Sequence, residues 1–155
     1  MKTGLKILTL FFALSMASCH PETNSGSSIS ASNPYDIMMN QATSWSECLS
    51  QEEAHYLVYL YSETCSSCNQ IKGDVVAFAN SNVVKTYFVD TAKPENTIQK
   101  CSAEEVEVGV SDVADLYIVG TPTLIEVRDG ATVSNVAGQN KCLTLINSLK
   151  NGSGN

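Results

Sequence analysis

The sequence has few basic residues and no run of them. Its 155 residues include nine Lys and Arg, of which Arg128 is the only arginine, against sixteen Asp and Glu. The formal net charge is -7. Because a general nucleic-acid binder needs a basic patch to neutralise phosphates, this composition excludes that class, and we expect no nucleic-acid partner.

The chain also lacks an apolar run long enough for a permanent transmembrane helix, which needs about 20 residues. The longest candidate spans residues 7–17, follows Lys2 and Lys6, and precedes small residues. This arrangement is typical of an export signal, so residues 1–18 are predicted to be a signal peptide. Without the two lysines the mature chain has seven basic and sixteen acidic residues, a formal charge of -9.

The end of the export signal, Met16-Ala17-Ser18-Cys19, resembles the lipobox of bacterial lipoproteins. In that family signal peptidase II cuts before a cysteine that carries lipid, so the resemblance implies that Cys19 is the lipidated N-terminus. Ordinary secretion with cleavage nearby is the alternative, because Met16 stands where the lipobox usually has Leu. The expected location is therefore the cell envelope, outside the cytoplasm and anchored to a membrane by lipid.

The remaining chain predicts one domain between two unstructured ends. Residues 19–33 and 151–155 are rich in Ser, Asn, Thr and Gly, a composition that predicts a flexible tether and a disordered tail. Residues 34–150 predict one α/β domain with a central mixed sheet, flanking helices and a terminal β-hairpin and helix. The expected elements are a helix within 34–50, a buried strand at 56–61, a helix capped by Ser66 or Ser67, a strand at 85–89, a loop with helical pieces at 90–109, a short helix at 111–116, strands at 123–127 and 132–137 joined by Asp129-Gly130, and a closing helix.

Cys65-Ser66-Ser67-Cys68 lies between the end of the predicted strand at 56–61 and the start of the next helix. A helix N-terminus stabilises a thiolate and lowers the pKa of the cysteine, to between roughly 3.5 and 7 in known cases. Cys65, nearer the helix start and solvent, is expected to be the nucleophile. Cys68, one turn inward, is expected to attack the mixed disulfide that Cys65 forms.

Together with Gly120-Thr121-Pro122-Thr123, this motif makes residues 35–150 resemble the thioredoxin superfamily. The resemblance implies a thioredoxin-like fold, a cis Pro122, and pairing of the Thr121 backbone with a substrate peptide that lies across Cys65. Three positions depart from thioredoxin. Ser66-Ser67 replaces Gly-Pro, Thr64 replaces Trp, and Tyr59 replaces a buried Asp that helps to move the proton of the second cysteine. Water or another group, such as Glu63, must then move that proton.

The other cysteines, Cys48, Cys101 and Cys142, have no second paired spacing. A zinc site needs four ligands, so no metal site is predicted. In an oxidising compartment we expect a structural disulfide between Cys101 and either of the other two, with the leftover thiol buried.

These patterns predict a thiol–disulfide oxidoreductase without a cofactor, since the two thiols of the motif carry the electrons. Its expected partners are exported cysteine-containing proteins and a membrane redox partner that recycles Cys65 and Cys68. A reductase or isomerase is slightly favoured over an oxidase. The alternative is a non-catalytic thioredoxin-like lipoprotein that acts as a binding or adaptor module, because a fold does not determine a function.

Overall fold

The computed structural model of the chain describes residues 33–103 and 106–152. The predicted signal peptide, the lipidation site Cys19 and nearly all of the predicted tether lie outside these residues. The last helix, α3 (Gln139–Gly152), extends two residues beyond the predicted end of the domain.

A four-stranded mixed sheet forms the centre of the domain, as the sequence predicted. The strands are β1 (His55–Tyr61), β2 (Lys85–Asp90), β5 (Thr123–Arg128) and β6 (Ala131–Ala137), in the order β2-β1-β5-β6. Strands β1 and β2 are parallel, whereas β5 is antiparallel to both β1 and β6. The crossover between the parallel strands is α2 (Ser66–Asn80), as expected for a βαβ unit.

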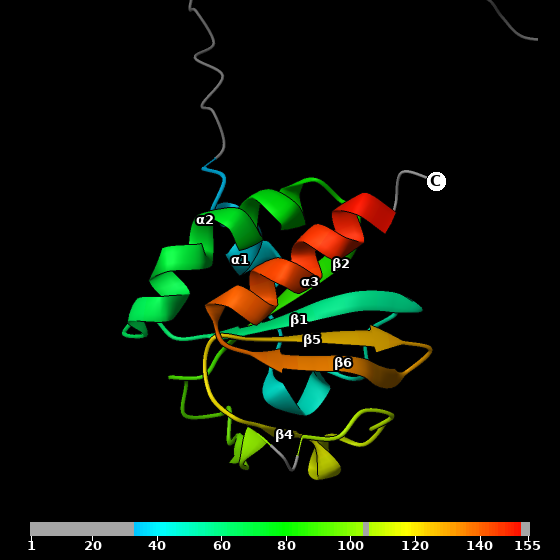
Figure 1. The fold of residues 1–155 in the computed structure, drawn as a ribbon. Helices are drawn as coiled ribbons and strands as arrows, with labels where there is room; N and C mark the ends of the chain where they lie inside the picture. The colour runs from blue at the N-terminus through cyan, green and yellow to red at the C-terminus, as the bar shows by residue number, and fades with distance from the viewer. Residues whose placement is uncertain (1–32, 104–105, 153–155) are drawn as a thin grey trace, which may run out of the picture. The chain divides into compact units, whose positions relative to one another are not determined.

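Hydrophobic side chains cover both faces of β1, which explains its continuous apolar sequence. Leu57 and Tyr59 point to the face covered by the helices, and Val58 and Leu60 to the opposite face. Figure 1 shows α1, α2 and α3 on the first side of the sheet and the segment that contains β4 on the other. The domain therefore has two hydrophobic clusters, one on each side of the sheet.

The hairpin between β5 and β6 turns at Asp129-Gly130, as predicted. Both residues have positive φ angles, 49° and 79° respectively. A two-residue turn of this kind matches the twist of the flanking strands and favours Asp followed by Gly.

The single helix predicted within residues 34–50 is wrong. The segment instead forms α1 (Asp36–Asn40) and a 3₁₀ turn at Trp45–Glu47, separated by extended backbone. Met38 and Trp45 belong to the clusters on opposite faces of the sheet, and one short helix does not reach both. The extended part pairs with the outer edge of β2, because Phe88 donates to Gln41 O at 2.9 Å and accepts from Thr43 N at 3.0 Å.

The chain between β2 and β5 folds over the face of the sheet that lies opposite the helices. It contains two short parallel strands, β3 (Gln99–Lys100) and β4 (Tyr117–Ile118), which the sequence did not predict. The helix expected at 111–116 is a 3₁₀ turn, Val113–Asp115, which is capped by Asp112. The segment also covers the outer edge of β6, since Thr132 accepts from Gly109 N at 2.6 Å and donates to Val110 O at 2.9 Å.

Candidate active site

Cys65 and Cys68 form a disulfide across the first turn of α2, with their Cα atoms 5.2 Å apart. Cys65 is the N-cap of the helix, and its sulfur accepts a hydrogen bond from the backbone N–H of Cys68 at 3.1 Å. The prediction that Ser66 or Ser67 caps the helix is therefore wrong. The cap is one residue earlier because the Cys65 sulfur already satisfies the N–H that a cap must bind.

The two cysteines differ in their access to solvent. Cys65 is half-buried, whereas only 2% of the Cys68 surface is exposed. Reduction of the disulfide therefore produces one thiol at the surface and a second thiol beneath it. A large substrate reaches the first sulfur more easily than the second.

The Thr121–Pro122 peptide bond is cis, as the resemblance implied. It directly precedes β5, whose first residue, Thr123, pairs with Leu60 near the end of β1. The carbonyl of Pro122 accepts a hydrogen bond from Gly138 N at 2.8 Å. Since β1 continues into the loop that carries Cys65, the cis-proline loop and the disulfide lie at the same end of the sheet (Figure 1).

Tyr59 lies in the middle of β1 and is 1% exposed. Its ring stacks on Tyr61 at 5.9 Å and contacts Phe88 edge to face at 6.2 Å. Its hydroxyl has no hydrogen-bond partner within the described part of the chain. Burial raises the pKa of this hydroxyl, so Tyr59 stays neutral and does not replace the missing carboxylate. Glu63, on the loop before Cys65, is exposed.

Cys48 and Cys142 are free thiols that are fully buried on opposite faces of the sheet. The predicted disulfide between Cys101 and either of them is therefore wrong. The Cys142 thiol instead faces two backbone carbonyls, those of Pro122 at 3.8 Å and Val136 at 3.6 Å. The prediction of a buried leftover thiol is confirmed, and it holds for both residues because each completes a hydrophobic cluster.

We expect Cys48 and Cys142 to resist alkylation while the protein is folded. Burial raises the pKa of Cys142 to about 11 and that of Cys48 to about 12, so both thiols stay almost entirely protonated in the folded protein at pH 8. After reduction, iodoacetamide should modify Cys65 within minutes, and Cys48 and Cys142 only in guanidinium. Peptide mass spectrometry measures both. Modification of either buried thiol at the rate of Cys65 would contradict this prediction.

The same burial makes the free energy of unfolding decrease as the pH rises through the alkaline range. Since the folded-state pKa of Cys142 is raised above that of an unfolded thiol, about 8.5, burial of the neutral thiol stabilises the fold fully below that value. This stabilisation is lost as the pH rises toward 11.

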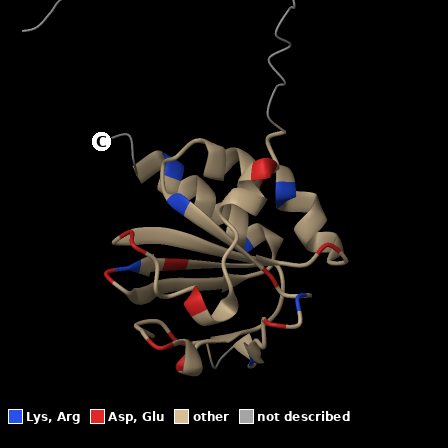
Figure 2. Ribbon diagram, turned by 180° about the vertical axis from the view of Figure 1, so that it is seen from behind, with Lys and Arg blue, Asp and Glu red and all other residues tan. Residues whose placement is uncertain are grey.

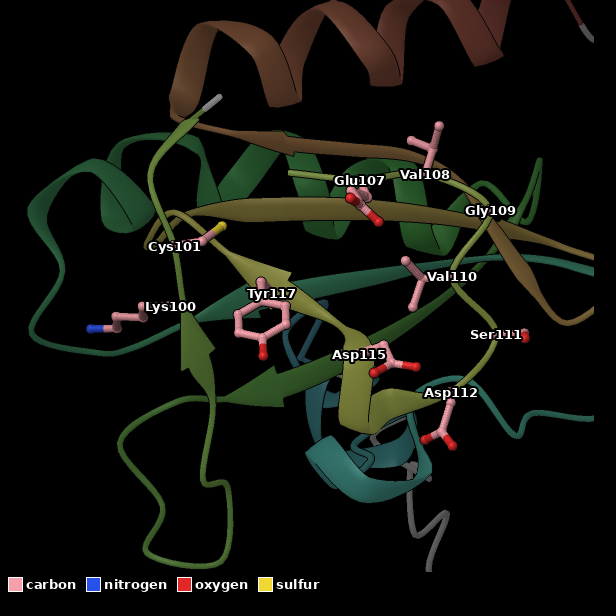
Figure 3. Close-up of a pocket in the computed structure, with 10 residues that line it drawn as sticks. All are labelled: Lys100, Cys101, Glu107, Val108, Gly109, Val110, Ser111, Asp112, Asp115 and Tyr117. Carbon is pink, nitrogen blue, oxygen red and sulfur yellow. The ribbon is translucent and has the colours of Figure 1, made fainter. Parts of the chain in front are cut away.

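Two of the cavities in the described part of the chain lie away from the disulfide, and the sequence predicted neither. The larger, about 730 Å³, is drawn in Figure 3 and includes the carboxylates of Glu107, Asp112 and Asp115. The smaller, about 250 Å³, has Thr121 in its wall.

Within residues 33–103 and 106–152, no group of three or more His, Cys, Asp or Glu is arranged to hold a metal ion. No helix in that part of the chain is both long and apolar enough to cross a bilayer.

Comparison with known proteins gives one family and several similar structures. The thioredoxin family profile matches residues 36–151. No curated protein matches the chain significantly. Mitochondrial thioredoxin 3 from Saccharomyces cerevisiae, in its oxidized form, is 14% identical with a TM-score of 0.53, covering 77% of this chain and 99% of that protein. Thioredoxin f2 from Chlamydomonas reinhardtii is 20% identical with a TM-score of 0.47, covering 69% of this chain and 93% of the other.

The family match covers the whole segment from α1 to α3, and the yeast structure shows the same fold. The disulfide has Cys-x-x-Cys spacing at a helix start, which is where the sequence pattern predicted a redox pair. The chain therefore belongs to the thioredoxin family, and its domain with the Cys65–Cys68 disulfide is that of a thiol–disulfide oxidoreductase.

Proposed function

We propose that the chain reduces or isomerises disulfides in exported proteins, with Cys65 as the nucleophile and Cys68 as the resolving thiol. The observation that carries this proposal is the disulfide at the start of α2, in which Cys65 is half-buried and Cys68 is buried. The helix N-terminus and the Cys68 N–H both stabilise negative charge on the Cys65 sulfur.

The reaction starts from the reduced pair. The Cys65 thiolate attacks one sulfur of a substrate disulfide, a mixed disulfide forms, and the other substrate sulfur leaves as a thiolate. The Cys68 thiol loses its proton and attacks the Cys65 sulfur, which forms the Cys65–Cys68 disulfide and releases the second substrate thiolate. The substrate gains two electrons and the protein loses two, so no cofactor is needed.

The cis-proline loop is the proposed substrate platform. Thr121 lies at the end of the sheet that carries the disulfide, and a polypeptide whose backbone pairs with Thr121 has its disulfide beside Cys65. In an extended peptide the main-chain hydrogen bonds give affinity for many sequences. This arrangement suits an enzyme that acts on several client proteins.

Export and anchoring are proposed from the N-terminal sequence alone. The predicted signal peptide at residues 1–18 and the lipid on Cys19 place the domain outside the cytoplasm, in the cell envelope. A reductase in that compartment needs electrons from a membrane redox partner, because the surroundings favour disulfides. The lipid anchor keeps the domain close to such a partner.

The reduction potential of the Cys65–Cys68 pair tests the direction of the reaction. We expect a value between about -180 and -270 mV, the range from disulfide isomerase to thioredoxin. The pair is equilibrated in glutathione or dithiothreitol buffers, and alkylated thiols are counted by mass spectrometry. A value near about -120 mV, typical of a strong oxidase, would refute the reductase or isomerase assignment. An unreactive pair would favour the adaptor alternative.

A further inference from the structure

The smaller cavity lies at the end of the sheet from which the chain continues to the active-site disulfide. Its volume is about 250 Å³. Thr121, in its wall, directly precedes the cis proline. Thr91, also in its wall, donates its backbone N–H to the carbonyl of Tyr61 at 2.7 Å, and β1 ends at Tyr61. A polypeptide bound along Thr121 therefore passes the cavity. The lining residues are Thr91, Asn96, Ile98, Lys100, Ile118 and Thr121.

One wall of the cavity is fixed by Asn96, whose side-chain amide is hydrogen-bonded within the protein through both its oxygen and its nitrogen. Its oxygen accepts from Trp45 N at 2.7 Å and its nitrogen donates to the carbonyl of Asp90 at 2.8 Å. Asn96 is only 7% exposed, so these bonds hold the loop after β2 in place. The cavity is therefore part of the folded structure and does not need a ligand to shape it.

The chemistry of the lining favours an anion. Lys100 is the one charged residue of the six, and the hydroxyls of Thr91 and Thr121 can donate hydrogen bonds. Ile118 is 1% exposed and supplies an apolar floor, which suits the methylene groups of a side chain. At about 30 Å³ for each water molecule, the space holds roughly eight waters. It lies below the range of about 300 to 1,000 Å³ typical of small-molecule sites, so one amino-acid side chain fits it better than a cofactor.

The carboxylates of the larger cavity do not neutralise Lys100. Although Lys100 also lines that cavity, Figure 3 shows its side chain extending away from Glu107, Asp112 and Asp115. The two ion pairs found within residues 33–103 and 106–152 both involve Glu126 and not Lys100. Figure 2 shows basic residues on several elements of the domain, and Lys100 is the one that lines this cavity and gives it a positive charge.

We propose that this cavity is a specificity pocket that binds an acidic side chain of the substrate polypeptide, with Lys100 as its counter-charge. The proposal rests on the proposed function, because a substrate must lie along Thr121 for its side chain to enter. The net negative charge of the domain acts over longer distances and is largely screened beyond about 8 Å at physiological salt. The short-range attraction to Lys100 therefore decides between substrates that are already docked.

The test compares peptides that differ only in one side chain near the cysteine. Each peptide carries one cysteine in a mixed disulfide with a neutral thiol, and Glu, Gln or Lys is moved through the three positions on each side of the cysteine. The pre-reduced full-length protein reduces each peptide in a single turnover, so no recycling partner is needed. We expect Glu to react about three- to tenfold faster than Gln at one position or two neighbouring positions, and Lys to react more slowly than Gln there.

Variants of Lys100 assign the preference to the cavity. In Lys100→Gln the rates for the Glu and Gln peptides should become equal, and in Lys100→Glu the Lys peptide should react fastest. Lys93→Gln and Lys93→Glu are matched controls, because Lys93 is an exposed lysine between β2 and β3 that does not line the cavity. They should keep the wild-type order of rates. Equal rates for Glu and Gln in the wild type, or a preference lost equally in the Lys93 variants, would overturn the proposal.

A small uncharged substrate separates this proposal from the proposed function. Hydroxyethyl disulfide has no side chain to enter the cavity, so the wild type and all four variants should reduce it at similar rates. If the wild type does not reduce it, the proposed function fails. If it is reduced normally while the peptides show no charge preference, only the specificity pocket is refuted.

Discussion

Replacing Cys65 with alanine is expected to abolish disulfide reduction, lowering its rate at least about a thousandfold. The Cys65 sulfur caps α2 and is the more exposed of the pair, so its removal takes away the sulfur of the redox pair that a protein substrate reaches directly. The remaining Cys68 is 2% exposed and cannot substitute for it. Insulin reduction in the presence of dithiothreitol, followed by turbidity, measures the effect.

Two further variants separate the roles of the sulfurs. Cys142→Ala is the matched control, because it removes a thiol that is buried beside the cis-proline loop, and it should keep most of the activity. Cys68→Ser should still attack a substrate but should stop at the mixed disulfide, which gel electrophoresis without reductant detects. Normal turnover by Cys65→Ala, or a trapped complex in Cys65→Ala rather than Cys68→Ser, would reverse the assignment.

Replacing Cys19 with alanine is expected to remove all lipid from the protein. An acyl chain contributes about 0.8 kcal/mol for each buried CH₂ group, and stable anchoring needs two such signals. A mature domain with a formal charge of -9 is repelled by an anionic membrane surface, so the protein itself adds no attraction. In cells grown with an alkyne fatty acid, the wild type should incorporate the label and Cys19→Ala should not.

Cys101→Ala is the control for labelling, since it keeps Cys19 and removes another cysteine. It should incorporate as much label as the wild type. The intact mass of the wild type gives an independent readout, because cleavage before Cys19 with acylation has a unique mass. A mature chain that starts at another residue and carries no acyl group would show ordinary secretion instead.

The strands of the sheet were predictable because their signals are local. The predicted runs at 56–61, 85–89, 123–127 and 132–137 differ from β1, β2, β5 and β6 by one residue at most at either end. The runs of β1 and β5 are apolar and buried, and Asp129-Gly130 favours the tight turn that joins β5 to β6. The cis Pro122 was predicted from the thioredoxin resemblance and not from local patterning.

The predictions that were wrong concern elements whose structure depends on contacts between distant residues. The apolar residues within 34–50 recur at helical spacing. The outer edge of β2 needs backbone hydrogen-bond partners, however, and Gln41 and Thr43 supply them at Phe88. Strands β3 and β4 are two residues long each, too short for any periodicity. The predicted disulfide of Cys101 failed as well, since Cys48 and Cys142 are both free thiols buried within the hydrophobic clusters.

The site was predictable only in part. The sequence identified Cys65 and Cys68 and, through the resemblance, the loop at Thr121 and Pro122. It did not identify Cys65 as the helix cap, because sulfur is an unusual capping acceptor. It also gave no signal for Lys100, which approaches Thr121 only because β3 pairs with β4.

Each outer edge of the sheet is occupied at one point, near the middle of β2 and near the start of β6. Gln41 and Thr43 bind Phe88 on β2, and Gly109 and Val110 bind Thr132 on β6. An open edge strand recruits other extended chains and promotes aggregation. A protein that meets partly unfolded clients is at particular risk, because such clients expose unpaired backbone. Because both edges are partly occupied, we expect a client to be held through the cis-proline loop and released after its disulfide has reacted, rather than retained as an added strand.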